Sequence, residues 1–119
     1  MSDSTRTEPL SARDWHVLVA LSEEDLHGYG IMKAVDRDSG GRVSAEIGSL
    51  YRVLDRLLEA GLVAEVDAPP DAPDGTRGRP RRYYRLTPLG REALRHEALR
   101  LRDTLELART RRLLPESVR

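Results

Sequence analysis

The stretch from Ser44 to Gly61, SAEIGSLYRVLDRLLEAG, constrains this chain more than any other. Ser44 is a good N-cap, and Gly61 suits the left-handed position at which helices commonly end. Apolar residues between them recur at helical spacing and predict one buried stripe, made by Ile47, Leu50, Leu54, Leu57 and Leu58. The opposite face carries small groups and then guanidinium groups, from Ala45, Ser49, Arg52 and Arg56. Because such a face can approach a duplex and reach its base edges, we predict a DNA-recognition helix.

Taken alone, this pattern is equally that of an ordinary amphipathic helix with a solvated face. The segments after Gly61 favour the DNA interpretation. Residues 62–66 and 81–86 read as short strands, and residues 67–80 between them are rich in Pro, Gly, Asp and Arg. From Arg77 to Arg85 there are five arginines and no acid. We therefore predict a basic β-hairpin, the wing of a winged helix-turn-helix. Its expected faces group Leu62, Ala64 and Val66 on the first strand, and on the second Tyr84 and Leu86 against Arg81, Tyr83 and Arg85.

Two helices are expected ahead of the recognition helix. The first runs from Leu10 to about Glu23 with Ser11 as its cap. The second runs from Tyr29 to about Ser39, presents Lys33 outward, and is followed by a turn at residues 40–43. A helix, a brief turn and a capped second helix make a helix-turn-helix.

The last helix is predicted over residues 87–114, with Thr87 as N-cap and Pro88 at the first helical position. It overruns a small domain and carries a heptad-like seam that needs a partner. A second copy of the chain is the simplest partner, and a helix folded back on its own domain is the alternative. The predicted dimerisation residues are Trp15, Leu94, Ala98, Leu101, Leu105 and Ala108.

Composition limits the possible functions. The 119 residues suffice for one small domain. There is no cysteine, which excludes disulfides, zinc–cysteine sites and thiol catalysis. No apolar run approaches the ~20 residues of a membrane span, and the polar N-terminus lacks a signal region, so we expect a cytoplasmic location. The three histidines are dispersed, and we expect no enzyme activity, no cofactor and no metal.

Three sequence blocks carry a family resemblance: HGYGIMKAV at 27–35, GSLYRVLDRLLEAGLV at 48–63 and GRPRRYYRLTPLGREAL at 78–94. Together they resemble the PadR family of bacterial transcriptional regulators, over residues 10 to about 110. The chain is similar to the short subfamily, in which one long C-terminal helix makes the dimer. The resemblance implies a dimeric repressor that binds a palindromic operator and is released by a small, often aromatic, effector.

The resemblance and the helix pattern together predict the DNA-contacting residues. The tyrosine of HGY, the start of the recognition helix and the basic wing are matched to family positions, and arginine stands at a recognition-helix position where the family often has proline. The predicted DNA-contacting residues are Tyr29, Lys33, Ser44, Ser49, Tyr51, Arg52, Arg56, Arg77, Arg79, Arg81 and Arg82. Trp15 is the one candidate for stacking on an aromatic effector, because the last helix has no aromatic residue.

The expected fold is mainly α with a small β-hairpin. Its predicted parts are a disordered arm (1–9), a winged helix-turn-helix (10–86), a dimerisation helix (87–114) and a tail (115–119). Gly90 is expected to pack closely against the first helix. The alternative function, left open by zero net charge, is a protein–protein interaction module that binds no DNA.

Overall fold

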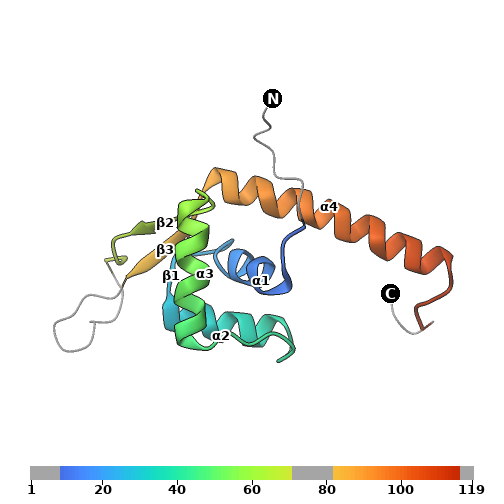
Figure 1. Ribbon diagram of the computed structural model, residues 1–119, viewed down its shortest axis with the longest axis horizontal. Helices are drawn as coiled ribbons and strands as arrows, with labels where there is room; N and C mark the ends of the chain where they lie inside the picture. Colours follow the sequence, from blue (N-terminus) through green and yellow to red (C-terminus); the bar gives the residue numbers. More distant parts are fainter. Residues whose placement is uncertain (1–8, 71–81, 116–119) are drawn as a thin grey trace.

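Four helices and a small antiparallel sheet make up the computed structural model, which describes residues 9–70 and 82–115 (Figure 1). In chain order the elements are α1 (Ala12–Ala20), β1 (Leu26–His27), α2 (Gly28–Asp38), α3 (Ile47–Glu59), β2 (Val63–Val66), β3 (Tyr83–Leu86) and α4 (Pro88–Thr110). This confirms the predicted fold class, a mainly helical winged helix-turn-helix with one long C-terminal helix. No helix in the described ranges is both long and apolar enough to span a membrane.

Three predicted helix ends are confirmed. The Ser11 hydroxyl accepts a hydrogen bond from the Asp14 amide, and Thr87 caps α4 by accepting from the Gly90 amide. Gly61 ends α3 with a positive φ of 79°, a conformation in which a Cβ would be strained. α4 ends at Thr110, four residues earlier than expected, and Arg112 adopts a φ of 59° just beyond it.

The predicted start of α3 is wrong. The helix begins at Ile47, with Glu46 in the N-cap position and no side-chain cap, so Ser44 caps nothing. Ala45, expected on the DNA-facing side, is buried at 3% exposure because the extended segment before α3 turns it into the core. Ile47, expected in the buried stripe, is 44% exposed, and Val53 takes a place in the core.

The sheet has three strands in the order β1-β3-β2, one more than the predicted hairpin. β1 lies between the first two predicted helices, where the sequence predicts no strand, and it pairs with β3 through the register His27 to Tyr83. That pairing also explains why Tyr83 is buried, although it was expected on the outer face with Arg85. Its ring stacks on His27 with a centroid distance of 5.2 Å. β3 is thus covered on both edges, and Tyr84 at its centre is 1% exposed.

The first part of α4 packs against α1 and β3, and Gly90 in its first turn also touches the chain just after α3. Gly90 lies on the Leu62 backbone, since an added Cβ would collide with the Leu62 carbonyl oxygen and the Leu86 side chain. The expected contact of Gly90 with the first helix is therefore wrong, and the close neighbour is the chain just after α3. Leu94 joins the core. Beyond Glu97 the helix projects away from the domain (Figure 1).

Candidate nucleic-acid interface

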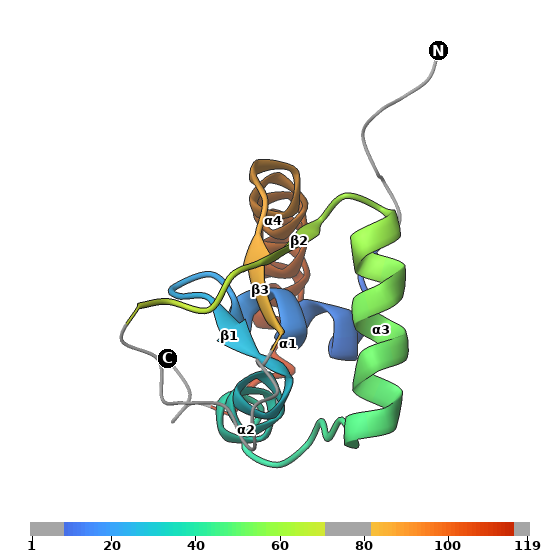
Figure 2. The ribbon, with the colours of Figure 1, turned by 90° about the vertical axis from the view of Figure 1, so that its left-hand side faces the viewer.

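α3 stands at one edge of the domain, with one long face open to solvent (Figure 2). Along this face Gly48 and Arg52 are exposed, Tyr51 is 37% exposed and Ser49 is half-buried. A Cβ added at Gly48 would meet nothing within 4 Å. The first turn of α3 is therefore exposed and has no side chain at Gly48, so the backbone of another molecule can approach it closely.

The segment His27–Gly28–Tyr29 positions side chains beside α3. His27 Nδ1 accepts a hydrogen bond from the Gly30 amide at 3.1 Å and caps α2. At Gly28 an added Cβ would lie 2.7 Å from the Tyr51 hydroxyl oxygen, so the missing side chain makes room for that ring. Sequence reasoning missed this pairing of Gly28 with Tyr51, because the two positions are linked only through the packing of α2 on α3.

Two residues of α2 lie on the outer surface next to this segment. Tyr29 is 55% exposed, and the Lys33 ammonium nitrogen lies 5.4 Å from the centroid of its ring. This cation–π contact leaves the charge of Lys33 in place while fixing its position. The structure thus brings Tyr29 and Lys33 together and leaves both accessible.

Arg56 is not a free cation on the α3 face. Both of its terminal nitrogens donate to the carboxylate of Asp14 on α1, at 2.9 and 3.0 Å. Asp14 is buried, and the hydrogen bonds to it raise the pKa of Arg56. A bidentate pair of this kind ties α3 to α1 and cancels the charge that the sequence pattern offered to DNA.

The described part of the wing carries one predicted contact residue, Arg82. Its guanidinium donates to both carboxylate oxygens of Glu65 on β2, at 3.1 and 3.0 Å, and lies 5.8 Å from the Tyr84 ring centroid. The pairing holds the pKa of Glu65 below its ordinary value. Three further predicted wing residues, Arg77, Arg79 and Arg81, lie outside the described residues.

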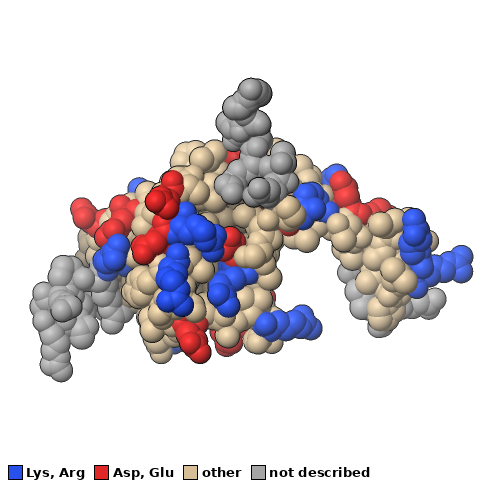
Figure 3. Space-filling model, viewed as in Figure 1, with Lys and Arg blue, Asp and Glu red and all other residues tan. Residues whose placement is uncertain are grey.

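Charge is distributed unevenly around α3. Figure 3 shows Lys and Arg side chains on and beside this helix, with Asp and Glu side chains next to them and toward its two ends. Charges of both signs therefore surround the open face. Ser44 lies exposed in the segment that leads into α3, at the edge of this face.

The predicted dimerisation residues fall into two groups. Leu94 belongs to the core of its own chain, and Trp15 is partly buried against that core. Farther along α4 the side chains of Leu101 and Leu105 are 43% and 46% exposed, Ala98 is exposed and Ala108 is half-buried. Only this second group offers an apolar surface that the chain itself leaves uncovered.

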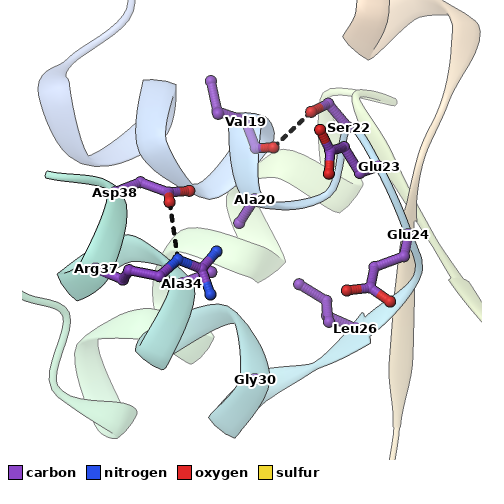
Figure 4. A pocket seen from close by; sticks show the side chains of 10 residues that line it. All are labelled: Val19, Ala20, Ser22, Glu23, Glu24, Leu26, Gly30, Ala34, Arg37 and Asp38. Atoms are coloured by element: carbon purple, nitrogen blue, oxygen red, sulfur yellow. Dashed lines mark hydrogen bonds and ion pairs between the residues drawn. The ribbon is translucent and has the colours of Figure 1, made fainter.

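A small cavity lies between the end of α1, β1 and α2 (Figure 4). Its volume is about 200 Å³, and an ion pair of 3.1 Å between Arg37 and Asp38 lies at its wall. Pockets that hold drug-sized ligands have volumes of roughly 300–1,000 Å³. Trp15 does not line this cavity. The cavity is therefore not the Trp15 site that the sequence predicts for an aromatic effector. Within the described residues no three His, Asp or Glu side chains gather as a metal site.

Comparison with known proteins gives a consistent result. The profile described as "Transcriptional regulator PadR-like family" matches residues 17–96. The transcriptional regulator Rv3488 of Mycobacterium tuberculosis is 37% identical over 88 residues, which are 74% of each chain. An uncharacterized 37.1 kDa protein in transposon TN4556 of Streptomyces fradiae is 42% identical over 82 residues. That match covers 69% of this chain and 21% of the transposon protein, so the chain spans about a fifth of that relative.

Solved structures share the fold. A PadR family transcription regulator from Clostridium difficile R20291 superposes with a TM-score of 0.67 at 21% identity, covering 84% of this chain and 97% of that one. Bacillus subtilis PadR in complex with operator DNA gives a TM-score of 0.59 at 24% identity, covering 71% of this chain and 46% of that one.

Proposed function

Because this chain belongs to the PadR-like family and is a DNA-binding transcriptional regulator, we propose that it acts as a homodimeric repressor of a palindromic operator. The family is one of regulators and not of enzymes. Membership also decides against the alternative of a winged-helix interaction module without DNA binding. A regulator of this kind acts where the DNA is, and for a prokaryotic cell this means the cytoplasm.

The open face of α3 is the observation that carries the proposal. We propose that its first two turns enter the major groove, where Ser49, Tyr51 and Arg52 meet base edges. Arg52 is the one guanidinium on this face without an acid partner among the described residues, since Arg56 is bound to Asp14. We therefore assign sequence choice mainly to Arg52, and to Arg56 a structural role.

Contacts with the DNA backbone come from the two sides of α3. Tyr29 and Lys33 are exposed beside its start and suit phosphate contacts. We propose that the wing binds the other DNA strand through Arg77, Arg79 and Arg81. Arg82 can join them by leaving its ion pair with Glu65 for a DNA phosphate. Such contacts supply affinity that depends on salt but not on sequence.

The dimer is proposed from α4. Its second half exposes leucines that no other part of the described chain covers, and two copies of the helix would cover each other. Symmetric halves of the operator, about one helical turn or ~34 Å apart, would then match two α3 helices.

We also propose that a small aromatic effector binds at Trp15. α1 and α4 contribute Trp15 as their one Phe, Tyr or Trp side chain, so a flat ligand held between dimer helices would stack on it. Trp15 is also the only tryptophan of the chain. Quenching of its fluorescence by a panel of phenolic acids tests the idea directly, and unchanged emission across the panel would remove Trp15 as the effector site.

The decisive experiment measures DNA binding with and without Arg52. Fluorescence anisotropy is recorded with labelled DNA from immediately upstream of the coding region and with random duplex, at ~50 and ~200 mM salt. We expect preference for the upstream DNA, and a loss of about 1–3 kcal/mol of that preference in Arg52→Ala. Arg95→Ala, an exposed arginine of α4, serves as the control. Equal losses of Arg52→Ala on both DNAs would reassign Arg52 to phosphate contact.

A further inference from the structure

An open hollow lies beside α3 where three segments meet. The N-terminal end of α1, the α2–α3 connection and the second half of α3 line it, and its volume is about 520 Å³. Arg13, Arg42 and Arg56 contribute one guanidinium from each segment, and Ser44 contributes a hydroxyl. The hollow thus gathers three guanidinium groups from three segments of the chain. The packing of the helices does not require this arrangement.

The charges of this hollow are only partly balanced. Asp14 is its one acid, and it is engaged by Arg56 through two hydrogen bonds. Arg13 and Arg42 are exposed, and the guanidinium group of neither forms an ion pair or hydrogen bond with another described residue. The hollow therefore presents two uncompensated guanidinium groups and a hydroxyl, and each of these groups can donate hydrogen bonds to an anion. Planar guanidinium donors favour phosphate oxygens.

The position of the hollow indicates the source of the phosphate. β2 and β3 lie on one side of α3, whereas the N-terminal end of α1 and the α2–α3 connection lie on the other (Figure 1). A helix in the major groove has a sugar–phosphate backbone on each side. Resting on the proposed function, we infer that this hollow binds a backbone phosphate of the DNA strand across the groove from the wing. Arg13 and Arg42 bind the phosphate. Arg56 stays paired with Asp14 and lines the hollow without binding the phosphate.

Removal of either free arginine tests the inference. Arg13→Ala and Arg42→Ala are measured on a random ~30-base-pair duplex, so that no operator needs to be known. Each is expected to weaken binding about threefold to tenfold at ~50 mM salt and to lower the slope of log affinity against log salt by about one. The loss of affinity should be the same on any DNA sequence, because a phosphate contact carries no sequence information. Arg42→Lys keeps the charge and should recover most of the affinity.

Arg95→Ala is the matched control, since it removes an exposed arginine of α4 outside the hollow. If wild-type protein binds duplex and both hollow variants behave like Arg95→Ala, the phosphate site is refuted and the proposed function stands. A loss confined to the preferred DNA would also refute it, because it would indicate base reading. If wild-type protein binds no duplex at all, the proposed function fails as well.

A second measurement separates DNA phosphate from a free phosphate group. Inorganic phosphate is titrated into ¹⁵N-labelled protein without DNA, and the side-chain Nε–H signals of Arg13 and Arg42 are followed. Weak shifts that do not saturate in the millimolar range agree with a DNA site, because one phosphate alone lacks the rest of the duplex. Saturation at micromolar phosphate would overturn the DNA assignment in favour of a small phosphorylated ligand.

Discussion

α4 is one continuous helix with two unlike halves. In the first half Gly90, Leu94 and Glu97 are buried against the winged helix-turn-helix. In the second half Leu101 and Leu105 are nearly half-exposed, and none of the residues from Ala98 to Thr110 is fully buried. The two halves have similar composition, so composition does not decide which half becomes core. What differs is whether the rest of the chain reaches the helix.

The same pair of residues at the same spacing occurs where the two halves meet and again within the second half. Arg100 donates to Glu97 at 3.0 Å, and Arg109 lies 3.5 Å from Glu106. The Glu97 side chain is 7% exposed and also accepts from the Leu10 amide, whereas the Glu106 side chain is 62% exposed. The comparison teaches that an ion pair stabilises a helix according to its surroundings and not its sequence.

The largest expected effect is on assembly through the second half. The double substitution Leu101→Glu/Leu105→Glu should turn the proposed dimer into monomers. Four half-exposed leucines, two from each copy, contribute about 1 kcal/mol each when covered, so the dissociation constant should rise about a thousandfold. Sedimentation velocity over a range of concentrations measures it, and helix content by circular dichroism should stay the same.

The opposite face of the same half supplies the control. Leu99 and Leu107 are 45% and 52% exposed, and each lies roughly 120–160° around the helix from Leu101 and Leu105. Leu99→Glu/Leu107→Glu introduces identical charges into the same half. If this control is a monomer and the first variant is a dimer, the interface lies on the Leu99 and Leu107 face, and the proposed face is wrong.

The next largest effect is on folding through the first half. Gly90→Ala should lower the free energy of unfolding by about 3 kcal/mol, because its Cβ collides with the Leu62 carbonyl oxygen and the backbone must move. Gly48→Ala is the matched glycine substitution in open space, and it should raise the stability by up to about 1 kcal/mol. Urea unfolding measures the free energy of unfolding of both variants against that of the wild type. Equal effects would mean that α4 does not pack tightly at Gly90.

A smaller effect is expected at Glu97, where the two halves meet. The hydrogen bond from Arg100, with that from the Leu10 amide, holds the pKa of Glu97 below its ordinary value. Because the folded-state pKa is the lower one, the stabilisation is present at neutral pH and is lost as the pH falls through the folded value. Glu97→Gln should cost about 1–2 kcal/mol at pH 7. In urea unfolding the difference from wild type should shrink below about pH 4; a constant difference would contradict the assignment.

Much of this architecture is predictable because local rules specify it. The caps at Ser11 and Thr87 and the left-handed Gly61 each depend on a few neighbouring residues, and all three are confirmed. The features that sequence reasoning missed depend on distant partners. β1 exists because Leu26 and His27 pair with β3, and nothing in those two residues alone indicates a strand.

The candidate site shows the same limit. The exposed position of Arg52 follows from helical periodicity, but the engagement of Arg56 by Asp14 joins residues 42 positions apart. Ser44 has the chemistry of a cap, yet burial of Ala45 takes precedence and moves the helix start to Ile47. Packing thus decides which side chains of a predicted face remain available.

The smallest effect is expected at Glu106, and it completes the comparison with Glu97. Glu106→Gln removes the same acid from the same i, i+3 arrangement with arginine, but both side chains are about half-exposed or more, so water screens the pair. We expect a loss of less than about 0.5 kcal/mol in urea unfolding at pH 7. The measurement is best made in the Leu101→Glu/Leu105→Glu background, where the second half stays uncovered. If Glu106→Gln cost as much as Glu97→Gln there, burial would not be what distinguishes the two halves of α4, and the helix itself would be the source of the stabilisation.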